Sequence, residues 1–264
     1  MLRNLLNRMR RPDITLPQED DILEISPPLE CTQQEIDRWN NEWLEYLRSE
    51  WMYQFLPHTD LQGTPPLPDD PMDMLNVSLR PGWTFALYCD RDALEGKAVM
   101  EMGCGCGNLG KQLGRYTRSY LGTDYSTLAL MVARLVSPGN CSYVHVSDRQ
   151  GLSPFFGRID TVVSRYFWIH QNLLQAGRSL DFLALFLKLG GRLYTDFYWP
   201  NPDVEQFIVR TPDEALSRQY PSATFRYTSE DVGRLIAGRP FRILREEISL
   251  GMQRRYVVLE RVEP

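Results

Sequence analysis

The chain lacks several features that would define its class at once. Its 264 residues contain no apolar run long enough to span a membrane, and no long apolar stretch of a secretory signal follows the basic residues 1–11. Cysteine is scarce: there are five, an odd number, and their spacing fits no zinc pattern. We therefore expect five free thiols in a reducing, cytoplasmic compartment, and no metal centre.

Positive charge is also in short supply. The 29 lysines and arginines are outnumbered by 34 acidic residues, which gives a net charge of −5 and a pI near 5.4. Proteins that bind nucleic acids through phosphate contacts are usually basic, so this composition disfavours a nucleic-acid partner. The hydrophobic fraction of 43% and charged fraction of 24% are those of a globular protein with a sizeable core.

The first third of the chain differs from the rest. Residues 1–30 join a basic amphipathic stretch to an acidic, proline-containing segment, and we expect them to be loosely ordered. A capping box over residues 32–35 predicts a helix to about residue 55. Five prolines within residues 57–72 then indicate an irregular connector, and a short helix is expected around 81–93. We expect residues 31–94 to form a helical extension that packs over the carboxyl edge of a sheet.

Beyond this extension the pattern alternates between strand and helix. Strand-like apolar runs occupy residues 97–102, 119–123, 141–147, 159–164 and 190–197, with helical stretches between most of them. Such alternation predicts an α/β fold with a parallel sheet and right-handed crossovers.

The end of the chain breaks this alternation. A helix over 229–238 leads to a strand over 241–249, and a further strand over 254–262 follows after a short turn. Two strands joined so tightly must be antiparallel. The sequence thus predicts a mostly parallel sheet that ends in an antiparallel hairpin.

The most specific local feature is a glycine turn. An apolar run that includes Glu101 is followed by Gly103, Gly105 and Gly107. This pattern predicts a buried strand that turns sharply into a helix, with a backbone free of Cβ atoms and open to close approach by a ligand. Ligands of open α/β sheets bind at this carboxyl edge.

Acidic residues recur at the same edge. Asp124 ends the second predicted strand, about 20 residues after the glycine turn, an offset at which a carboxylate can accept hydrogen bonds from a ribose. Asp148 ends the third. A single strand-end carboxylate is commonly a helix N-cap, but three in register with Glu101 are harder to explain by capping alone.

These features together resemble the class I S-adenosylmethionine-dependent methyltransferases. Residues 101–107 are similar to the acidic-x-Gly-x-Gly-x-Gly motif of that family, and Asp124 and Asp148 match its ribose-side and adenine-side acids. Residues 159–170 resemble its fourth-strand motif, which often ends in His, and residues 189–193 its Gly-Gly turn into the fifth strand. The resemblance covers residues 95–264 and implies a Rossmann-like, seven-stranded sheet.

The resemblance also implies S-adenosylmethionine as the cofactor. Glu101 would meet its ammonium group, Asp124 its ribose hydroxyls and Asp148 its adenine amino group. The other cofactor-binding residues implied are Gly103, Cys104, Gly105, Gly107, Tyr125, Arg149, Ser164 and Arg165.

Two residues after the fourth strand are catalytic candidates. His170 is the best placed of three histidines to act as a general base, with a structural role as the alternative, and Tyr166 could orient the substrate. The Asn/Asp-Pro-Pro-Tyr signature of amino-directed nucleic-acid methyltransferases is missing at this place, which reads Ser-Arg-Tyr-Phe. We therefore expect a small-molecule acceptor, methylated at oxygen or nitrogen rather than carbon. The oligomeric state is left open.

Two other functions stay open at this stage. One is a non-catalytic cofactor-binding module that kept the fold. The other is an NAD(P)-dependent oxidoreductase, because Gly105, Gly107 and Gly110 also satisfy Gly-x-Gly-x-x-Gly. The late start of that motif and the terminal hairpin make this reading the weaker one.

Overall fold

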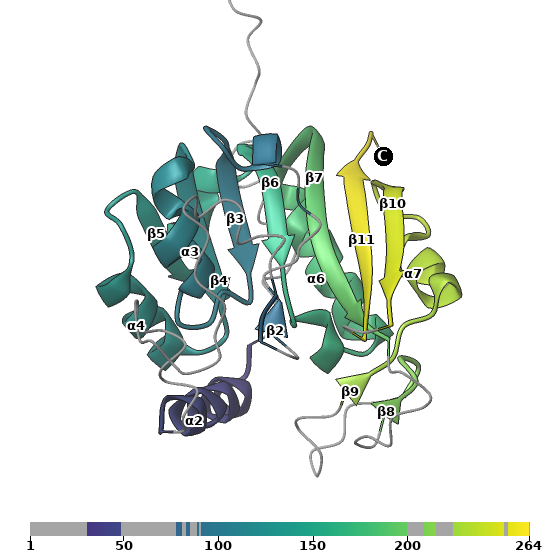
Figure 1. Cartoon of the computed structure of the whole chain (residues 1–264), viewed down its shortest axis with the longest axis horizontal. Coiled ribbons are helices and arrows are strands. Elements are labelled where there is room, and N and C mark those ends of the chain that lie inside the picture. The colour runs from purple at the N-terminus through teal and green to yellow at the C-terminus, as the bar shows by residue number, and fades with distance from the viewer. Residues whose placement is uncertain are drawn as a thin grey trace, which may run out of the picture.

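The described residues are organised around one seven-stranded sheet with the order β10-β11-β7-β6-β3-β4-β5 (Figure 1). The computed structural model describes residues 31–48, 78–80, 83–84, 89, 91–199, 209–214, 224–250 and 253–263. The strands of the sheet are β3 (Ala98–Met102), β4 (Ser119–Asp124), β5 (Cys141–His145), β6 (Ile159–Ser164), β7 (Leu187–Tyr198), β10 (Phe241–Ser249) and β11 (Arg254–Arg261).

The direction of these strands confirms the predicted fold class. Strands β5, β4, β3, β6 and β7 pair in parallel, whereas β11 is antiparallel to both β7 and β10. The register aligns the carboxyl ends, since Met102 lies opposite both Thr123 and Ser164. The alternating pattern and the terminal hairpin are both found as predicted.

Helices cover both faces of the sheet, and several begin at a side-chain cap. Ser126 accepts a hydrogen bond from the amide of Ala129, while Asn172 and Thr228 each form a capping box. The α-helices are α2 (Gln33–Arg48), α3 (Asn108–Leu113), α4 (Thr127–Val136), α5 (Arg149–Leu152), α6 (Leu173–Phe186) and α7 (Ser229–Ile236). The 3₁₀ turns among the described residues are η5 (Arg91–Ala93), η6 (Gly114–Tyr116), η7 (Ser153–Phe155) and η8 (Trp168–His170).

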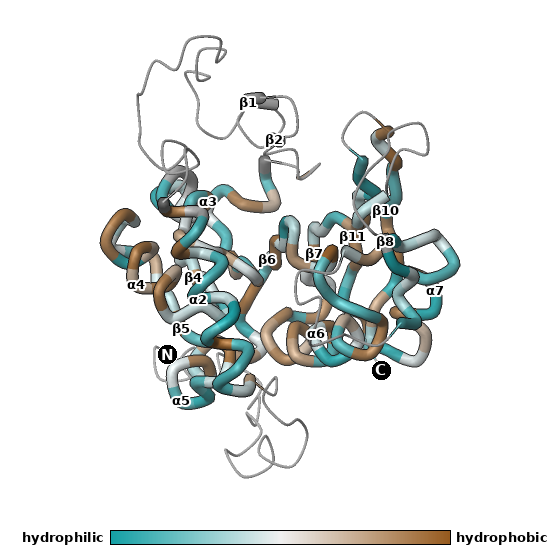
Figure 2. The backbone as a smooth tube through the Cα atoms, turned by 90° about the horizontal axis from the view of Figure 1, so that it is seen from below, coloured by the Kyte–Doolittle hydropathy of each residue, from teal (hydrophilic) through white to brown (hydrophobic). Residues whose placement is uncertain are grey.

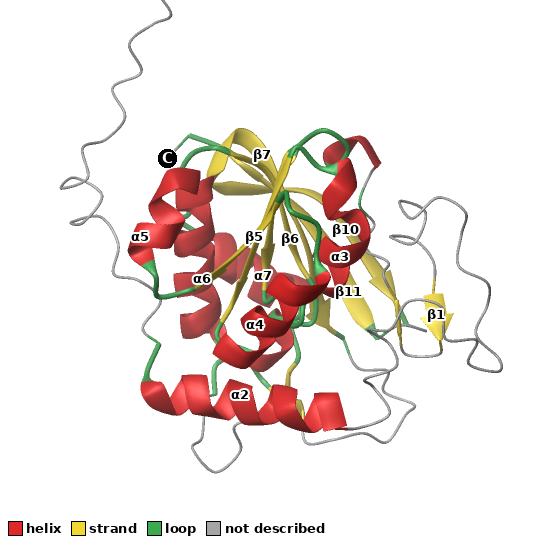
Figure 3. Cartoon of the chain, turned by 90° about the vertical axis from the view of Figure 1, so that its left-hand side faces the viewer, coloured by secondary structure: helices red, strands yellow, loops and turns green. Residues whose placement is uncertain are grey.

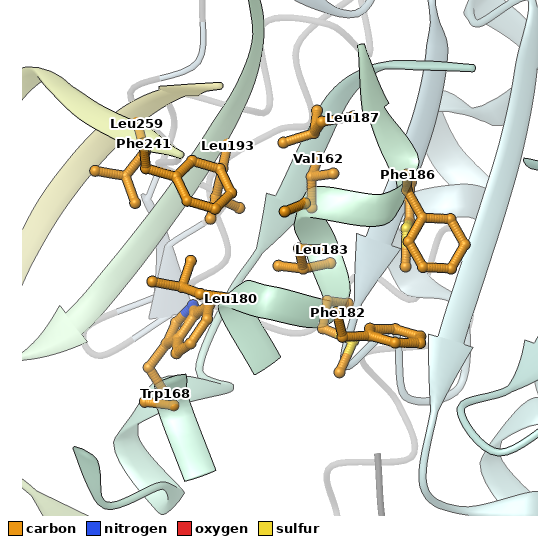
Figure 4. Close-up of a cluster of buried hydrophobic side chains, with 14 of the residues drawn as sticks. Val162, Trp168, Leu180, Phe182, Leu183, Phe186, Leu187, Leu193, Phe241 and Leu259 are labelled. Carbon is orange, nitrogen blue, oxygen red and sulfur yellow. The ribbon is translucent and has the colours of Figure 1, made fainter. Parts of the chain in front are cut away.

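Alternate residues of the central strands enter two separate cores, because successive side chains of a strand point to opposite faces. Met100 and Val162 belong to the larger core, which α6 and α7 cover with Leu180, Leu183 and other residues (Figure 4). The neighbouring residues Val99 and Val163 face the other core, beneath α3 and α4. Burial on both faces explains why β3 is apolar at every position except Glu101.

The region before the sheet differs from the prediction. Within the predicted helix around 81–93, Trp83–Thr84 instead forms strand β2, which pairs with β1 (Ser78–Arg80), and among the residues of this range that the structure describes only η5 is helical. Short apolar runs do not distinguish helix from strand by themselves, which accounts for the error. The predicted loose segment 1–30 and the connector 57–72 lie outside the described residues. A second small sheet pairs β8 (Val209–Arg210) with β9 (Thr224–Phe225).

One helix lies across the carboxyl edge of the sheet. Figure 3 shows α2 below the ends of the parallel strands, and Figure 2 looks onto this edge from below, with α2 on the side of β4 and β5. Helix α2 contacts α4 in particular. Among the described residues, no helix has the length and apolarity needed to cross a membrane.

Candidate active site

The glycine turn leaves β3 as a strand–turn–helix unit, as predicted. The amides of Gly103 and Cys104 both donate to the carbonyl oxygen of Thr123, at 2.8 and 3.0 Å, which ties the turn to the end of β4. Gly105 has a φ of +52° and Gly107 one of +77°, conformations that L side chains rarely adopt. Gly107 then begins α3. The backbone of this turn is therefore held by β4 on one side and by α3 on the other.

Glu101 is buried beside this turn. Its side chain accepts a hydrogen bond from the hydroxyl of Tyr120, and Oε1 lies 3.7 Å from Nη2 of Arg165. The residue is 2% exposed, and burial raises the pKa of Glu101 to about 7, although Arg165 and Tyr120 act in the opposite direction. A cation that binds beside such a carboxyl favours its ionised form, so the carboxyl loses its proton on binding.

Asp124 is the second buried carboxylate, at the end of β4. Its Oδ2 accepts from the amide of Gly105 and its Oδ1 from the amide of Ser126, both at 2.8 Å. Burial raises the pKa of Asp124, and these amides offset part of that effect. Each carboxylate oxygen can accept more than one hydrogen bond, so the group keeps acceptor capacity for a pair of hydroxyls.

Helix α2 closes the site from the outside. A Cβ built on Gly105 would lie only 2.2 Å from Cζ2 of Trp43, so the indole packs directly on the glycine turn. On the same helix, Oδ1 of Asn40 accepts from the Ser126 hydroxyl at 2.8 Å and from the Leu128 amide at 3.0 Å. Asn40 thereby joins α2 to the N-terminus of α4, which follows Asp124.

The end of β6 carries a strained residue. Tyr166 has a φ of +53°, uncommon for an aromatic residue, and its amide donates to Oδ1 of Asp196 at 2.8 Å. Asp196 also accepts from Nε of Arg254 at 3.1 Å, and the Arg254 guanidinium lies 4.4 Å from the centre of the Tyr166 ring. Strain of this kind is kept where the surrounding contacts enforce it, and it concentrates at functional sites.

The other predicted residues near β6 line the same edge. Ser164 is fully buried and donates to the carbonyl oxygen of Met102 at 3.3 Å. Arg165 lies next to Glu101 and also lowers the pKa of Asp196 through its charge, although burial of Asp196 has the larger, raising effect. The structure thus places Arg165 between two buried carboxylates.

His170 lies at the end of η8 and faces α2. Its ring centre is 5.5 Å from that of Trp39, in an edge-to-face arrangement. The imidazole therefore borders the space between η8 and α2. Whether it acts on an acceptor stays a prediction.

The end of β5 is arranged differently. Asp148 is exposed, three residues beyond the last residue of β5, and its Oδ1 accepts from the Gly151 amide at 2.9 Å as the N-cap of α5. Arg149 is the first residue of that helix. His145 instead bonds to the carbonyl oxygen of Tyr125 at 3.0 Å and holds the two strand ends together. The capping role is visible for Asp148, and its contact with an adenine stays a prediction.

The structure places Glu101, Asp124, Ser164 and Arg165 at the same edge of the sheet, and it adds residues there that were not predicted from the sequence. Asp196 is a further acid at the carboxyl edge, and its place at the end of the predicted fifth strand was a usable signal. The Arg254 partner comes from β11 and carried no local signal. Among the described residues no cluster of side chains could hold a metal ion, and all five cysteines are free thiols.

Comparison with solved structures defines the class of this fold. The chain matches an S-adenosylmethionine-dependent methyltransferase from Anabaena variabilis with 16% identity and a TM-score of 0.55, over 86% of this chain and 94% of the other. It matches magnesium protoporphyrin IX methyltransferase from Synechocystis, with bound S-adenosylhomocysteine, at 17% identity and a TM-score of 0.52, over 86% and 97% of the two chains. Neither a scan against protein-family models nor a search of curated proteins finds a match. The chain therefore has the fold of the class I S-adenosylmethionine-dependent methyltransferases, at a level of identity that shows the fold alone.

Proposed function

We propose that this protein is an S-adenosylmethionine-dependent methyltransferase that acts on a small molecule. The observation that carries the proposal is the pair of buried carboxylates, Glu101 and Asp124, on neighbouring strands and on either side of the glycine turn. The class I sheet order and the solved neighbours that carry this activity in their names support it. The bound cofactor supplies an electrophilic methyl group on a sulfonium sulfur.

The residues present fit that cofactor in charge and hydrogen-bonding capacity. Glu101 would face its ammonium group, Asp124 would accept from both ribose hydroxyls, and the turn backbone would face the amino acid tail. Trp43 bounds the space over Gly105, so a ligand on that side of the turn must displace the indole. Asp148 would add an acceptor for the adenine amino group.

The acceptor would lie toward the ends of β6 and β7. Tyr166 and Trp39 offer aromatic walls there, and Phe167 packs on Gly103. The acidic composition disfavours nucleic acid, and magnesium protoporphyrin IX, in the name of one structural neighbour, is a small molecule. We therefore favour oxygen or nitrogen methylation of a small acceptor, in a cytoplasmic setting that suits five free thiols.

His170 is the proposed general base, with Tyr166 in an orienting role. Replacing His170 by Ala should lower kcat by about 10²–10⁴, the usual contribution of a positioned base, and leave cofactor affinity nearly unchanged. The alternative role is structural, since the ring packs on Trp39. In that case the variant would lose thermal stability but keep its turnover per folded molecule, so both quantities are measured on one preparation.

Calorimetric titration with S-adenosylhomocysteine and with NADH tests the cofactor directly. We expect saturable binding of the first and none of the second. Asp124→Asn should weaken that binding by about 1.5–3 kcal/mol, the size of a lost charge-assisted hydrogen bond. Saturable NADH binding without any response to S-adenosylhomocysteine would overturn the proposal. Cofactor binding without turnover in an acceptor screen would favour the non-catalytic module.

A further inference from the structure

A guanidinium edge on α2 is buried without an acceptor. Nε and Nη2 of Arg38 are both inaccessible to solvent, and no hydrogen-bond acceptor reaches either atom. The guanidinium carbon lies 4.7 Å from the centre of the Trp39 ring, which fixes the side chain by a cation–π contact. Burial lowers the pKa of Arg38, and the carboxylates Glu42 and Glu35 offset this only in part.

Neither of these two carboxylates supplies an acceptor to Nε or Nη2 of Arg38. Glu35 is engaged at the start of α2, where Oε2 accepts from the amide of Thr32 at 3.0 Å and from its hydroxyl at 3.2 Å. A buried donor without a partner costs free energy, and a charged donor costs more than a neutral one. A bound ligand that supplied an acceptor would remove this cost.

Arg38 also borders the proposed reaction site. The Trp39 indole contacts Arg38 through its ring face and His170 edge to face. A single aromatic side chain thus separates the guanidinium from the candidate base. A group bound to Arg38 would belong to a molecule that extends toward His170.

We propose that Arg38 recognises an oxyanion, a carboxylate or a phosphate, on the methyl acceptor. The Nε–Nη2 edge presents two parallel N–H groups, a geometry that matches two oxygens of either group. That the anion belongs to a methyl acceptor rests on the proposed function. The anion site itself requires no cofactor. It narrows the substrate class to small molecules that carry a negative charge as well as the methylated oxygen or nitrogen.

Nitrogen NMR of arginine side chains in the full chain tests this without any cofactor. The Arg38 Nε signal is assigned by its loss in Arg38→Lys, and the wild type is titrated separately with acetate and with inorganic phosphate. We expect saturation of the Arg38 signal with a dissociation constant of about 1–10 mM for at least one anion. The arm that saturates more tightly identifies the oxyanion. A response that stays linear and unsaturated in both arms would refute the proposal.

Two variants separate recognition from a structural role. Arg38→Gln lacks the reporting Nε signal, so its anion titration is followed by the backbone amide signals of α2 and compared with the same signals in the wild type. The variant should bind the anion at least about tenfold more weakly, a difference of about 1.4 kcal/mol. The matched control is Arg115→Gln, since Arg115 also stacks on the next residue, Tyr116, at 4.9 Å but is exposed. The control should bind the anion as the wild type does.

Thermal unfolding in anion-free buffer completes the test. Arg38→Met should unfold about 2–4 °C above the wild type, because it removes an unpaired buried charge. Unfolding below the wild type would show that Arg38 supports the fold itself, and the proposal would fail. Calorimetry with S-adenosylhomocysteine on the same samples tests the proposed function separately. Anion binding without cofactor binding would support the anion site at Arg38 and contradict the methyltransferase function.

Discussion

The pKa of Glu101 predicts that binding of the proposed cofactor depends on pH, by an amount that follows from the pKa itself. The carboxyl is buried between Tyr120 and Arg165, with a pKa of about 7, so roughly half of the protein carries it protonated near neutrality. A ligand ammonium group pairs only with the ionised form. The dissociation constant of S-adenosylhomocysteine should therefore be about eightfold larger at about pH 6 than at about pH 7.5.

Calorimetry in two buffers with different ionisation heats measures both the affinity and the proton released. Near pH 7 we expect release of roughly half a proton on binding. Glu101→Gln should bind more weakly and lose the pH dependence, whereas Asp124→Asn should weaken binding at every pH and keep it. A wild-type affinity that stays flat from pH 6 to 7.5, or a slope that survives Glu101→Gln, would refute this reasoning.

The same group predicts how stability changes with pH. Its folded pKa of about 7 lies above the ordinary value of 4.5, so its contribution to stability is complete below the unfolded pKa and is lost as the pH rises through the folded one. Between about pH 5 and pH 8 the free energy of unfolding should fall by about 2.5 kcal/mol from this group. Urea unfolding of the wild type and of Glu101→Gln, repeated at several pH values, isolates the contribution of this group. An equal change of the free energy of unfolding with pH in the two proteins would contradict the assignment.

Three further substitutions test the contacts around the site. Asn40→Ala removes the link from α2 to α4 and should cost about 1–2 kcal/mol in urea unfolding; no loss would mean that α2 is held by other contacts. Gly105→Ala places a Cβ against Trp43 and should lower the unfolding temperature. The double variant with Trp43→Ala should recover part of this loss, because the steric overlap is removed while the backbone strain at residue 105 remains. Asp196→Asn leaves the buried Arg254 without its charge partner and should cost about 3–5 kcal/mol by chemical denaturation, with a small effect counting against a buried pair.

The sequence was sufficient for the parts of the fold that local pattern controls. The glycine turn, the strand ends at Glu101 and Asp124, and the terminal hairpin follow from apolar runs, turn chemistry and chain connectivity, and they are where they were predicted. The packing of Trp43 on Gly105 was not predictable, because it joins residues far apart in the chain. Trp39 and Trp43 showed only helical spacing, which does not reveal what a helix covers.

The remaining differences have a similar physical origin. Asp148 satisfied the spacing for an adenine contact and also for an N-cap, and only the fold shows that it caps α5. The positive φ of Tyr166 is set by Asp196, on another strand, so no local signal announced it. The sequence predicts the strands and helices themselves, but it does not predict the contacts that form between the ends of different strands.

The place of β11 in the sheet has a consequence for how the chain is made. This strand follows β10 in sequence but lies between β10 and β7, and among the described strands it is the only neighbour of β10 in the sheet (Figure 1). During synthesis β10 emerges before the strand that connects it to the rest of the molecule, and the outer edge of β7 stays open until then. That open edge is a surface on which nascent chains can pair with one another, so a ribosome stalled before Arg254 would hold an aggregation-prone intermediate rather than a smaller folded domain.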